Sequence, residues 1–225
     1  MTETQQMSTA DLLAREAIAL AGESRAILGI AGSPGAGKST LVDELLDRIS
    51  AVKGDAWVAH IPMDGFHLAD AQLDRIGARG RKGAPDTFDV LGYAALLRRL
   101  LDDRDDVIYA PGFERVLEQP IAGAIPIERP ARLIISEGNY LLLDEPGWQS
   151  LRPLFAEVWY ADLDHPARLR RLIERHVRFG KDESAAIAWA TGTDERNALL
   201  IAGTRDRADL IVPAALIHGV GSAPT

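Results

Sequence analysis

The chain has 225 residues, of which 47% are hydrophobic, a formal net charge of -8 and no cysteine. The acidity argues against a nucleic-acid partner, because binding to a phosphate backbone needs clustered positive charge. Without cysteine there is neither a disulfide framework nor a thiolate metal site. We also find no apolar run near the roughly 18 residues of a membrane span and no signal-peptide core at the amino terminus, so we expect a cytoplasmic protein.

The first part of the chain predicts a helix, a strand, a glycine-rich turn and a second helix. Ser8 has the side chain of an N-cap, and the apolar positions that follow it up to Leu20 indicate a helix. The apolar run 26–31 is typical of a buried parallel strand. The repeat of apolar residues in 41–49 predicts a helix.

Strand and helix patterns alternate in the rest of the chain. Further strands are predicted at 56–61, 132–136, 157–161 and 209–212, with the clearest helices at 93–101 and 167–177. This alternation predicts an α/β fold in which a mostly parallel sheet of about five strands lies between two helical layers. Proline and glycine recur in 78–86 and 110–126, where we expect mobile, irregular loops with room for a short hairpin.

The turn GSPGAGKST (32–40) has the spacing of a phosphate-binding loop, Gly32-x-x-x-x-Gly37-Lys38-Ser39. Glycines let backbone N–H groups converge on a phosphate at the positive end of the next helix. Lys38 would reach the β and γ phosphates of ATP, and the Ser39 hydroxyl would hold Mg²⁺. The preceding strand and following helix favour this interpretation over a merely flexible turn, and they predict the three-layer sandwich of a P-loop NTPase.

Two acids follow predicted strands and would lie at the same edge of the sheet as this loop. Asp64 could accept a proton from an attacking hydroxyl group or hold Mg²⁺ through water; the alternative is a simple Asp-Gly turn. Glu137 could belong to the Mg²⁺ environment or cap the next helix. His67, three residues after Asp64, is a candidate for contact with a substrate.

Four arginines, Arg168, Arg171, Arg175 and Arg178, share one face of the predicted helix 167–177 and its end. Guanidinium groups near a triphosphate can stabilise charge on a transferring phosphoryl group, so we expect Arg171 and Arg175 to contact phosphate. A solvated face is the alternative. Asp144 begins a loose D-x-x-G match to GTPases, but no N-K-x-D element accompanies it.

Five segments in this order resemble the P-loop kinases that include uridine kinase, type I pantothenate kinase and phosphoribulokinase. They are GSPGAGKST, MDGFH (63–67), KGAPDTFDV (82–90), SEGNYLLL (136–143) and TRDRADLIVP (204–213). The likeness extends from about residue 26 to 213 and implies a kinase core at about 24–64 and 131–214. It also implies a substrate-side insertion at about 65–130 and a lid at about 168–195, within a single domain 1–225.

The resemblance also implies roles for individual residues. Asp64 would be the catalytic base, with Lys38 and Arg175 acting on the phosphates and Ser39 and Glu137 at the metal. The residues expected to bind ATP are Gly32, Ser33, Gly35, Ala36, Gly37, Lys38, Ser39, Thr40, Arg171, Arg175 and Arg205, the last beside adenine. The residues expected to bind the acceptor are Asp64, His67, Tyr109, Phe113 and Arg115. The pantothenate kinases' V-Y-S-H element reads Ile108-Tyr109-Ala110-Pro111 here, which weakens the likeness in the acceptor region.

These observations favour an ATP- and Mg²⁺-dependent kinase that phosphorylates a hydroxyl group of a small metabolite such as a nucleoside, a pantothenate-like compound or a sugar. The small-molecule alcohol is its expected partner, and pairing into a homodimer is a further expectation from the related kinases. The alternative is a nucleotide-dependent regulatory ATPase or switch that binds a protein. A non-catalytic ATP-binding module is disfavoured, because the lysine, the serine and both candidate acids are present together.

Overall fold

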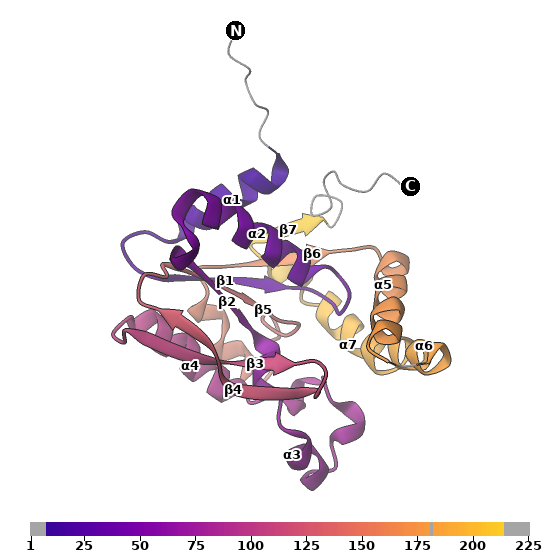
Figure 1. Cartoon of the computed structure of the whole chain (residues 1–225). Coiled ribbons are helices and arrows are strands. Elements are labelled where there is room, and N and C mark those ends of the chain that lie inside the picture. The colour runs from indigo at the N-terminus through magenta and orange to yellow at the C-terminus, as the bar shows by residue number, and fades with distance from the viewer. Residues whose placement is uncertain (1–7, 181, 214–225) are drawn as a thin grey trace.

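The computed structural model describes residues 8–180 and 182–213. Five parallel strands form one sheet in the order β2-β5-β1-β6-β7, and helices cover both of its faces (Figure 1). The strands of this sheet are β1 (Ala26–Ala31), β2 (Val58–Pro62), β5 (Leu133–Glu137), β6 (Glu157–Asp162) and β7 (Leu210–Pro213). The helices are α1 (Thr9–Leu20), α2 (Lys38–Lys53), α3 (Asp70–Arg75), α4 (Val90–Asp102), α5 (His165–Arg178), α6 (Glu183–Thr191) and α7 (Thr193–Ala202). The predicted three-layer α/β/α sandwich is confirmed.

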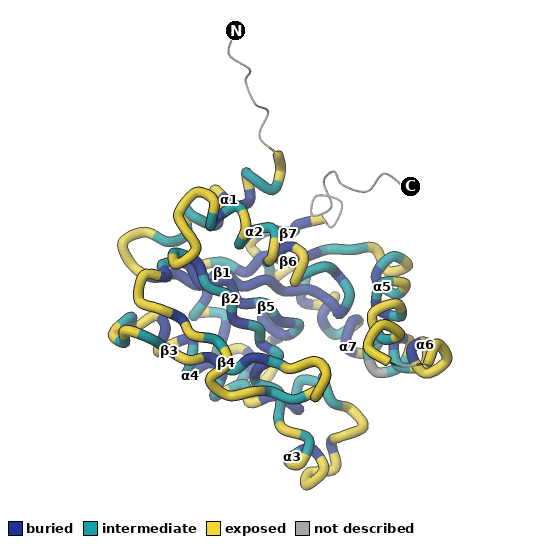
Figure 2. Tube along the Cα trace, in the orientation of Figure 1, coloured by how far each residue is buried: buried dark blue, intermediate teal, exposed yellow. Residues whose placement is uncertain are grey.

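Side chains of the central strand alternate between two hydrophobic cores, one on each face of the sheet. Ile27 of β1 packs in the core that α4 completes, whereas Leu28 and Ile30 pack in the core that α1 and α2 complete. All six residues of β1 are buried, as Figure 2 shows for the interior of the molecule. Within the described ranges, no helix combines the length and the apolar character that a membrane crossing requires.

The register of the sheet brings three strand ends together. Glu137, the last residue of β5, is level with Ile30 of β1 on one side and with Pro62 of β2 on the other. Because parallel strands all end at the same edge, the segments that follow β1, β2 and β5 leave the sheet side by side. This edge therefore gathers the glycine-rich loop, the turn that contains Asp64, and Glu137.

The segment 65–130 is more regular than its proline and glycine content predicts. Residues 110–126 lie in an antiparallel hairpin of β3 (Val107–Glu114) and β4 (Gln119–Glu128), not in an irregular loop. A two-stranded ribbon leaves one edge of each strand unpaired, so prolines are tolerated there. The pairing register shifts opposite Pro111, and Gly123 has a positive φ of 67° within this irregularity of β4, as expected of a bulge.

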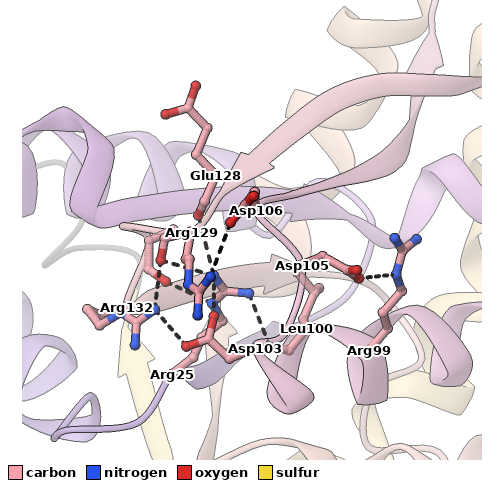
Figure 3. A network of polar contacts seen from close by, with 10 residues as sticks. Arg25, Arg99, Leu100, Asp103, Asp105, Asp106, Glu128, Arg129 and Arg132 are labelled. Atoms are coloured by element: carbon pink, nitrogen blue, oxygen red, sulfur yellow. Dashed lines mark hydrogen bonds and ion pairs between the residues drawn. The ribbon is translucent and has the colours of Figure 1, made fainter.

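Arg25 ties this segment to the start of β1 (Figure 3). Its guanidinium donates hydrogen bonds to the carbonyl oxygens of Ala131 at 2.8 Å and Leu100 at 3.1 Å and forms an ion pair with Asp103 at 2.8 Å. The Arg25 side chain is 1% exposed. One buried cation therefore joins the end of α4 and the end of the hairpin to the central strand.

Candidate functional site

The glycine-rich loop connects β1 to α2 and leaves the amino terminus of α2 without a side-chain cap. Gly35 and Gly37 have φ angles of 82° and 97°, which side-chain-bearing residues rarely adopt. The uncapped end presents backbone N–H groups and the positive end of the helix dipole. This part of the loop can therefore bind an anion such as a phosphate.

A cavity of about 710 Å³, here called the P-loop cavity, opens over this helix end. The predicted ATP-binding residues among its lining are Gly35, Gly37, Lys38, Ser39, Thr40, Arg171 and Arg175. Gly32, Ser33 and Ala36 are buried and are not part of the lining, and the Ala36 N–H group donates to the Ser33 carbonyl at 3.0 Å. The structure therefore does not bring Ala36 to the cavity, because its N–H group and its side chain are both turned inward.

Lys38 is held beneath the loop by three oxygen atoms. Its Nζ donates to the carbonyls of Gly32 at 2.9 Å and Ser33 at 3.2 Å and to Asn139 Oδ1 at 2.7 Å. Burial lowers the pKa of the Lys38 ammonium to about 8, and the nearby charge of Glu137 opposes this shift. The sequence does not predict this role of Asn139, because nothing in its local pattern indicates a contact 101 residues away.

Ser39 and Glu137 face each other across the edge of the sheet. The Ser39 hydroxyl lies 3.0 and 2.9 Å from the two carboxylate oxygens of Glu137. These oxygens fit Mg²⁺, which takes one or two carboxylates together with phosphate and water oxygens. Among the described residues, no group of three or more His, Cys, Asp or Glu side chains could hold a metal, so an ion here would need further ligands from phosphate or water.

Asp64 lies in the short 3-10 turn Met63–Phe66 that directly follows β2. A small junction cavity of about 70 Å³ has Asp64, Lys38, Ser39 and Glu137 among its lining residues. Arg115 Nη2 approaches Asp64 Oδ2 to 3.8 Å. The structure therefore brings the candidate base into the same small space as the loop lysine and the Ser39–Glu137 pair.

Gly65 allows the hairpin to lie against this turn. A Cβ atom on Gly65 would be 2.3 Å from the carbonyl oxygen of Pro111 in β3. No side chain larger than hydrogen fits such an approach. The close contact brings the end of β3, with Phe113 and the following Arg115, to the side of Asp64.

A third cavity, here called the hairpin cavity, has a volume of about 290 Å³. Asp64, His67, Phe113, Arg115 and Arg175 are among its lining residues, so four of the five predicted acceptor residues meet there. Burial lowers the pKa of His67, and its Nδ1 lies 2.8 Å from the Asp64 carbonyl oxygen. The ring is therefore neutral at pH 7, with the proton on Nδ1, because a carbonyl oxygen only accepts.

Tyr109 is the exception among the predicted acceptor residues. Its side chain is 61% exposed, and it lines neither the P-loop cavity nor the hairpin cavity. It precedes Phe113 by four residues in β3, which is about 13 Å along an extended strand. The prediction that Tyr109 binds the acceptor is therefore not supported by its position.

The arginines of α5 divide into two groups. Arg171, Arg175 and Arg178 line the P-loop cavity. Arg168 is 4% exposed, forms an ion pair with Glu195 of α7 and donates to the Pro34 carbonyl at 3.4 Å. Of the four arginines predicted to share one helix face, three therefore line the P-loop cavity, and the fourth, Arg168, is buried and connects α5 to α7 and to the loop.

Two further sequence candidates lie outside the P-loop cavity. Arg205 forms an ion pair with Asp162, at the end of β6, at 2.9 Å and is not part of the cavity lining. Asp144 forms an ion pair with Arg207 at 2.9 Å, and it too is absent from that lining. The loose GTPase match that begins at Asp144 therefore has no place beside the phosphate-binding loop.

Comparison with known proteins gives matches over most of the chain. It is 36% identical over 162 residues to "Putative uridine kinase C227.14" of Schizosaccharomyces pombe, which covers 70% of this chain and 69% of that protein. It is 37% identical over 145 residues to "ATP-dependent kinase-like protein notR'" of Aspergillus versicolor, which covers 60% of this chain and 84% of that protein. The family model of the methylmalonyl Co-A mutase-associated GTPase MeaB matches residues 1–65.

A solved structure agrees with these sequence matches. The crystal structure of a "putative fructose transport system kinase" from Silicibacter sp. TM1040 superposes with a TM-score of 0.83 at 34% identity. The match covers 92% of this chain and 100% of that one. The match therefore leaves 8% of this chain uncovered.

Proposed function

The chain belongs to the family of P-loop kinases that contains these relatives, and from this premise we propose that it transfers the terminal phosphoryl group of ATP to a hydroxyl group of a small molecule. The observation that carries the proposal is the junction cavity, whose lining joins Lys38 and Ser39 of the loop to Asp64. Arg115 and Arg175 line the P-loop cavity and the hairpin cavity alike. Two binding spaces that share cationic residues suit transfer between two bound molecules.

In the proposed reaction, the acceptor lies in the hairpin cavity with its hydroxyl group at Asp64. The hydroxyl oxygen forms a bond to the γ phosphorus, the bond from that phosphorus to the bridging oxygen of ADP breaks, and the hydroxyl proton passes to the Asp64 carboxylate. ADP then leaves with the electron pair of the broken bond. Asp64 acts as the base, and its carboxylate orients the attacking oxygen before transfer.

The remaining groups of the site bind and neutralise the phosphates in this proposal. The N–H groups of the loop and the Lys38 ammonium hold the β and γ phosphates, while Arg171 and Arg175 contact them from α5. Ser39 and Glu137 would hold Mg²⁺, which supplies positive charge against the charge on the transferring group. Arg175 and Arg115 border both binding spaces and so lie where that charge moves.

A regulatory ATPase or switch is the competing function. The hairpin cavity disfavours it, because a switch needs no second small-molecule space beside the candidate base. The MeaB family match over residues 1–65 ends at the Asp64 turn and includes none of the hairpin or of α5. What this chain shares with that GTPase family is thus confined to the nucleotide-binding half of the site.

An ADP-release assay tests the proposal. We would measure the rate with ATP or GTP and Mg²⁺ against a panel of nucleosides, pantothenate, sugars and related alcohols, with water as the background. A rate well above the water rate with one acceptor, lost in Lys38→Met, is the expected result. A slow rate that no alcohol raises, together with nucleotide-dependent capture of a protein, would support the switch instead.

A further inference from the structure

A cluster of charged side chains lies in the hairpin cavity in addition to Asp64. Asp70, at the start of α3, forms ion pairs with Lys82 through Oδ1 at 2.7 Å and with Arg79 through Oδ2 at 2.8 Å. All three residues line the cavity, and we call them the Lys82 cluster. Arg79 also approaches Asp74 at 3.3 Å, but the Asp74 side chain is 61% exposed and water screens this contact. Two cations therefore share one carboxylate on the cavity wall.

Lys82 is the buried cation of this cluster, with a side chain that is 13% exposed. Its ammonium group donates to Asp70 Oδ1 and to the carbonyl oxygen of Glu118 in the hairpin. These contacts use two of the three ammonium hydrogens. The remaining N–H group can donate to an oxygen atom of a molecule in the cavity that Lys82 lines.

An aromatic stretch of wall connects the Lys82 cluster to the candidate base. The His67 ring contacts the Asp64 carbonyl on one side, and its centroid lies 5.0 Å from that of Phe113 on the other. Lys82 Nζ lies 5.5 Å from the centroid of the same Phe113 ring. A molecule whose hydroxyl group is at Asp64 can therefore lie along Phe113 with its other end at Lys82.

The charge of the cavity departs from that of the whole protein. The chain has a net charge of -8, but the cavity lining contains four cations and three carboxylates, with both histidines counted as neutral. The cations are Arg79, Lys82, Arg115 and Arg175, and the carboxylates are Asp64, Asp70 and Glu118. Both Asp70 oxygens already contact cations, which leaves the cluster better suited to an anionic group than to a neutral hydroxyl group.

We propose that the acceptor alcohol carries a negatively charged carboxylate or phosphate group, which Lys82 and Arg79 bind at the far end of the hairpin cavity. This inference rests on the proposed kinase function and specifies its substrate class. Lys82 is then a specificity-determining residue, because it contacts the anionic group and not the hydroxyl group that reacts. A volume of about 290 Å³ restricts the acceptor to a small metabolite.

The test compares acceptors that differ only in the anionic group. The pairs are D-glycerate with glycerol, pantothenate with panthenol, and fructose 6-phosphate with fructose, so that the carboxylate and phosphate arms are separate. The variants are Lys82→Met, Lys82→Arg and the control Arg81→Met, which removes a neighbouring cation that pairs with Asp86 and lies outside the cavity lining. In Lys82→Met, Asp70 keeps Arg79 as a partner, so the variant leaves no carboxylate unpaired.

We expect an anionic acceptor to be preferred over its neutral counterpart. Lys82→Met should lower kcat/KM for that acceptor about 10- to 100-fold, the loss of one hydrogen bond to a charged group, mainly through KM. Lys82→Arg should recover part of the loss, and Arg81→Met should match the wild type. Equal or better use of the neutral members by the wild-type protein would overturn the anion proposal and leave the kinase function standing.

A binding measurement covers the case in which no alcohol is phosphorylated, a result that would itself contradict the kinase function. The P-loop is saturated with a non-hydrolysable ATP analogue and Mg²⁺, and the melting temperature is followed as inorganic phosphate replaces chloride at constant ionic strength. Wild type and Arg81→Met should gain stability and Lys82→Met should gain less. The same response in all three proteins would overturn the proposal.

Discussion

Gly65 is the position at which a single methyl group should disturb the site most. In Gly65→Ala the new Cβ would lie 2.3 Å from the Pro111 carbonyl oxygen, and 2.7 Å from its carbonyl carbon. Real Cβ atoms essentially never come closer than 3.0 Å, so the hairpin and the turn must separate by at least 0.7 Å. Both contacting atoms belong to the backbone, so a side-chain rotation cannot relieve the clash.

The expected loss of stability in Gly65→Ala follows from this overlap. Forcing an extra methyl group into a packed contact costs about 1–3 kcal/mol, and each kcal/mol lowers the melting temperature of a chain of this size by about 2–4 °C. The rate of acceptor-dependent ADP release should also fall, and by a larger factor than the loss of folded protein would explain. The displacement moves Phe113 and Arg115 away from Asp64, and a misplacement of about 1 Å in an active site can cost about 100-fold in rate.

Thermal unfolding and acceptor-dependent ADP release of Gly65→Ala measure the two effects. The matched control is Gly80→Ala, in the same segment, where a Cβ meets no atom within 4 Å and the backbone needs no positive φ. ATP affinity should be unchanged in Gly80→Ala and should change less than turnover in Gly65→Ala, because the P-loop cavity contains neither residue, although Arg115 in its lining follows the hairpin. If Gly65→Ala melted and reacted like Gly80→Ala, the close approach of the hairpin to the turn would be refuted.

Three other variants test separate features. Asp64→Asn should lower kcat by about 10²- to 10⁴-fold with ATP affinity unchanged by calorimetry, and wild-type turnover would exclude Asp64 as the base. Arg25→Met should cost about 1–3 kcal/mol in urea unfolding, because it leaves the buried carbonyl oxygens of Ala131 and Leu100 without their donor, whereas Asp103 keeps its ion pair with Arg132; the exposed Arg99→Met is the control, and equal losses would contradict this reason. Burial lowers the pKa of His67, so its contribution to stability is present above about pH 6.5 and is lost as the pH falls below it. The melting temperature should therefore fall less between pH 7.5 and 5.5 in His67→Gln than in the wild type, and the same decrease in both would contradict a neutral, buried ring.

The parallel core could be predicted because each strand has its own local signal. Buried parallel strands are short apolar runs, and all five lie within two residues of the predicted positions. The N-cap at Ser8 is confirmed by its bond from the Asp11 N–H. The hairpin could be predicted only as a short element among irregular loops, because proline rules out a central strand but not a strand of a two-stranded ribbon, and the sequence alone does not show how many strands lie beside a given strand.

The residues of the candidate site likewise divide into those whose meeting could be predicted from the sequence and those whose contacts could not. Lys38, Ser39, Asp64 and Glu137 could be predicted to meet, because the ends of parallel strands share one edge. Asn139 and the Lys82 cluster could not, because their contacts depend on how loops pack and leave no periodic signal. Tyr109 is the converse case, since its role in the acceptor site is implied by the related kinases, but its side chain is exposed and lines neither the P-loop cavity nor the hairpin cavity.

The nucleotide-binding half of the candidate site and the hairpin cavity are attached to the rest of the protein by different elements. Lys38, Ser39 and Glu137 are fixed by the central strands and α2, whereas Lys82 and Phe113 belong to the segment between β2 and β5. Within that segment the hairpin lies against the Asp64 turn through the Gly65–Pro111 approach, and Arg25 ties the segment to β1. Under the proposed function, substitutions of hairpin-cavity residues that do not line the P-loop cavity, such as Lys82, should therefore change acceptor selectivity without changing the affinity for ATP, provided that these two attachments are kept.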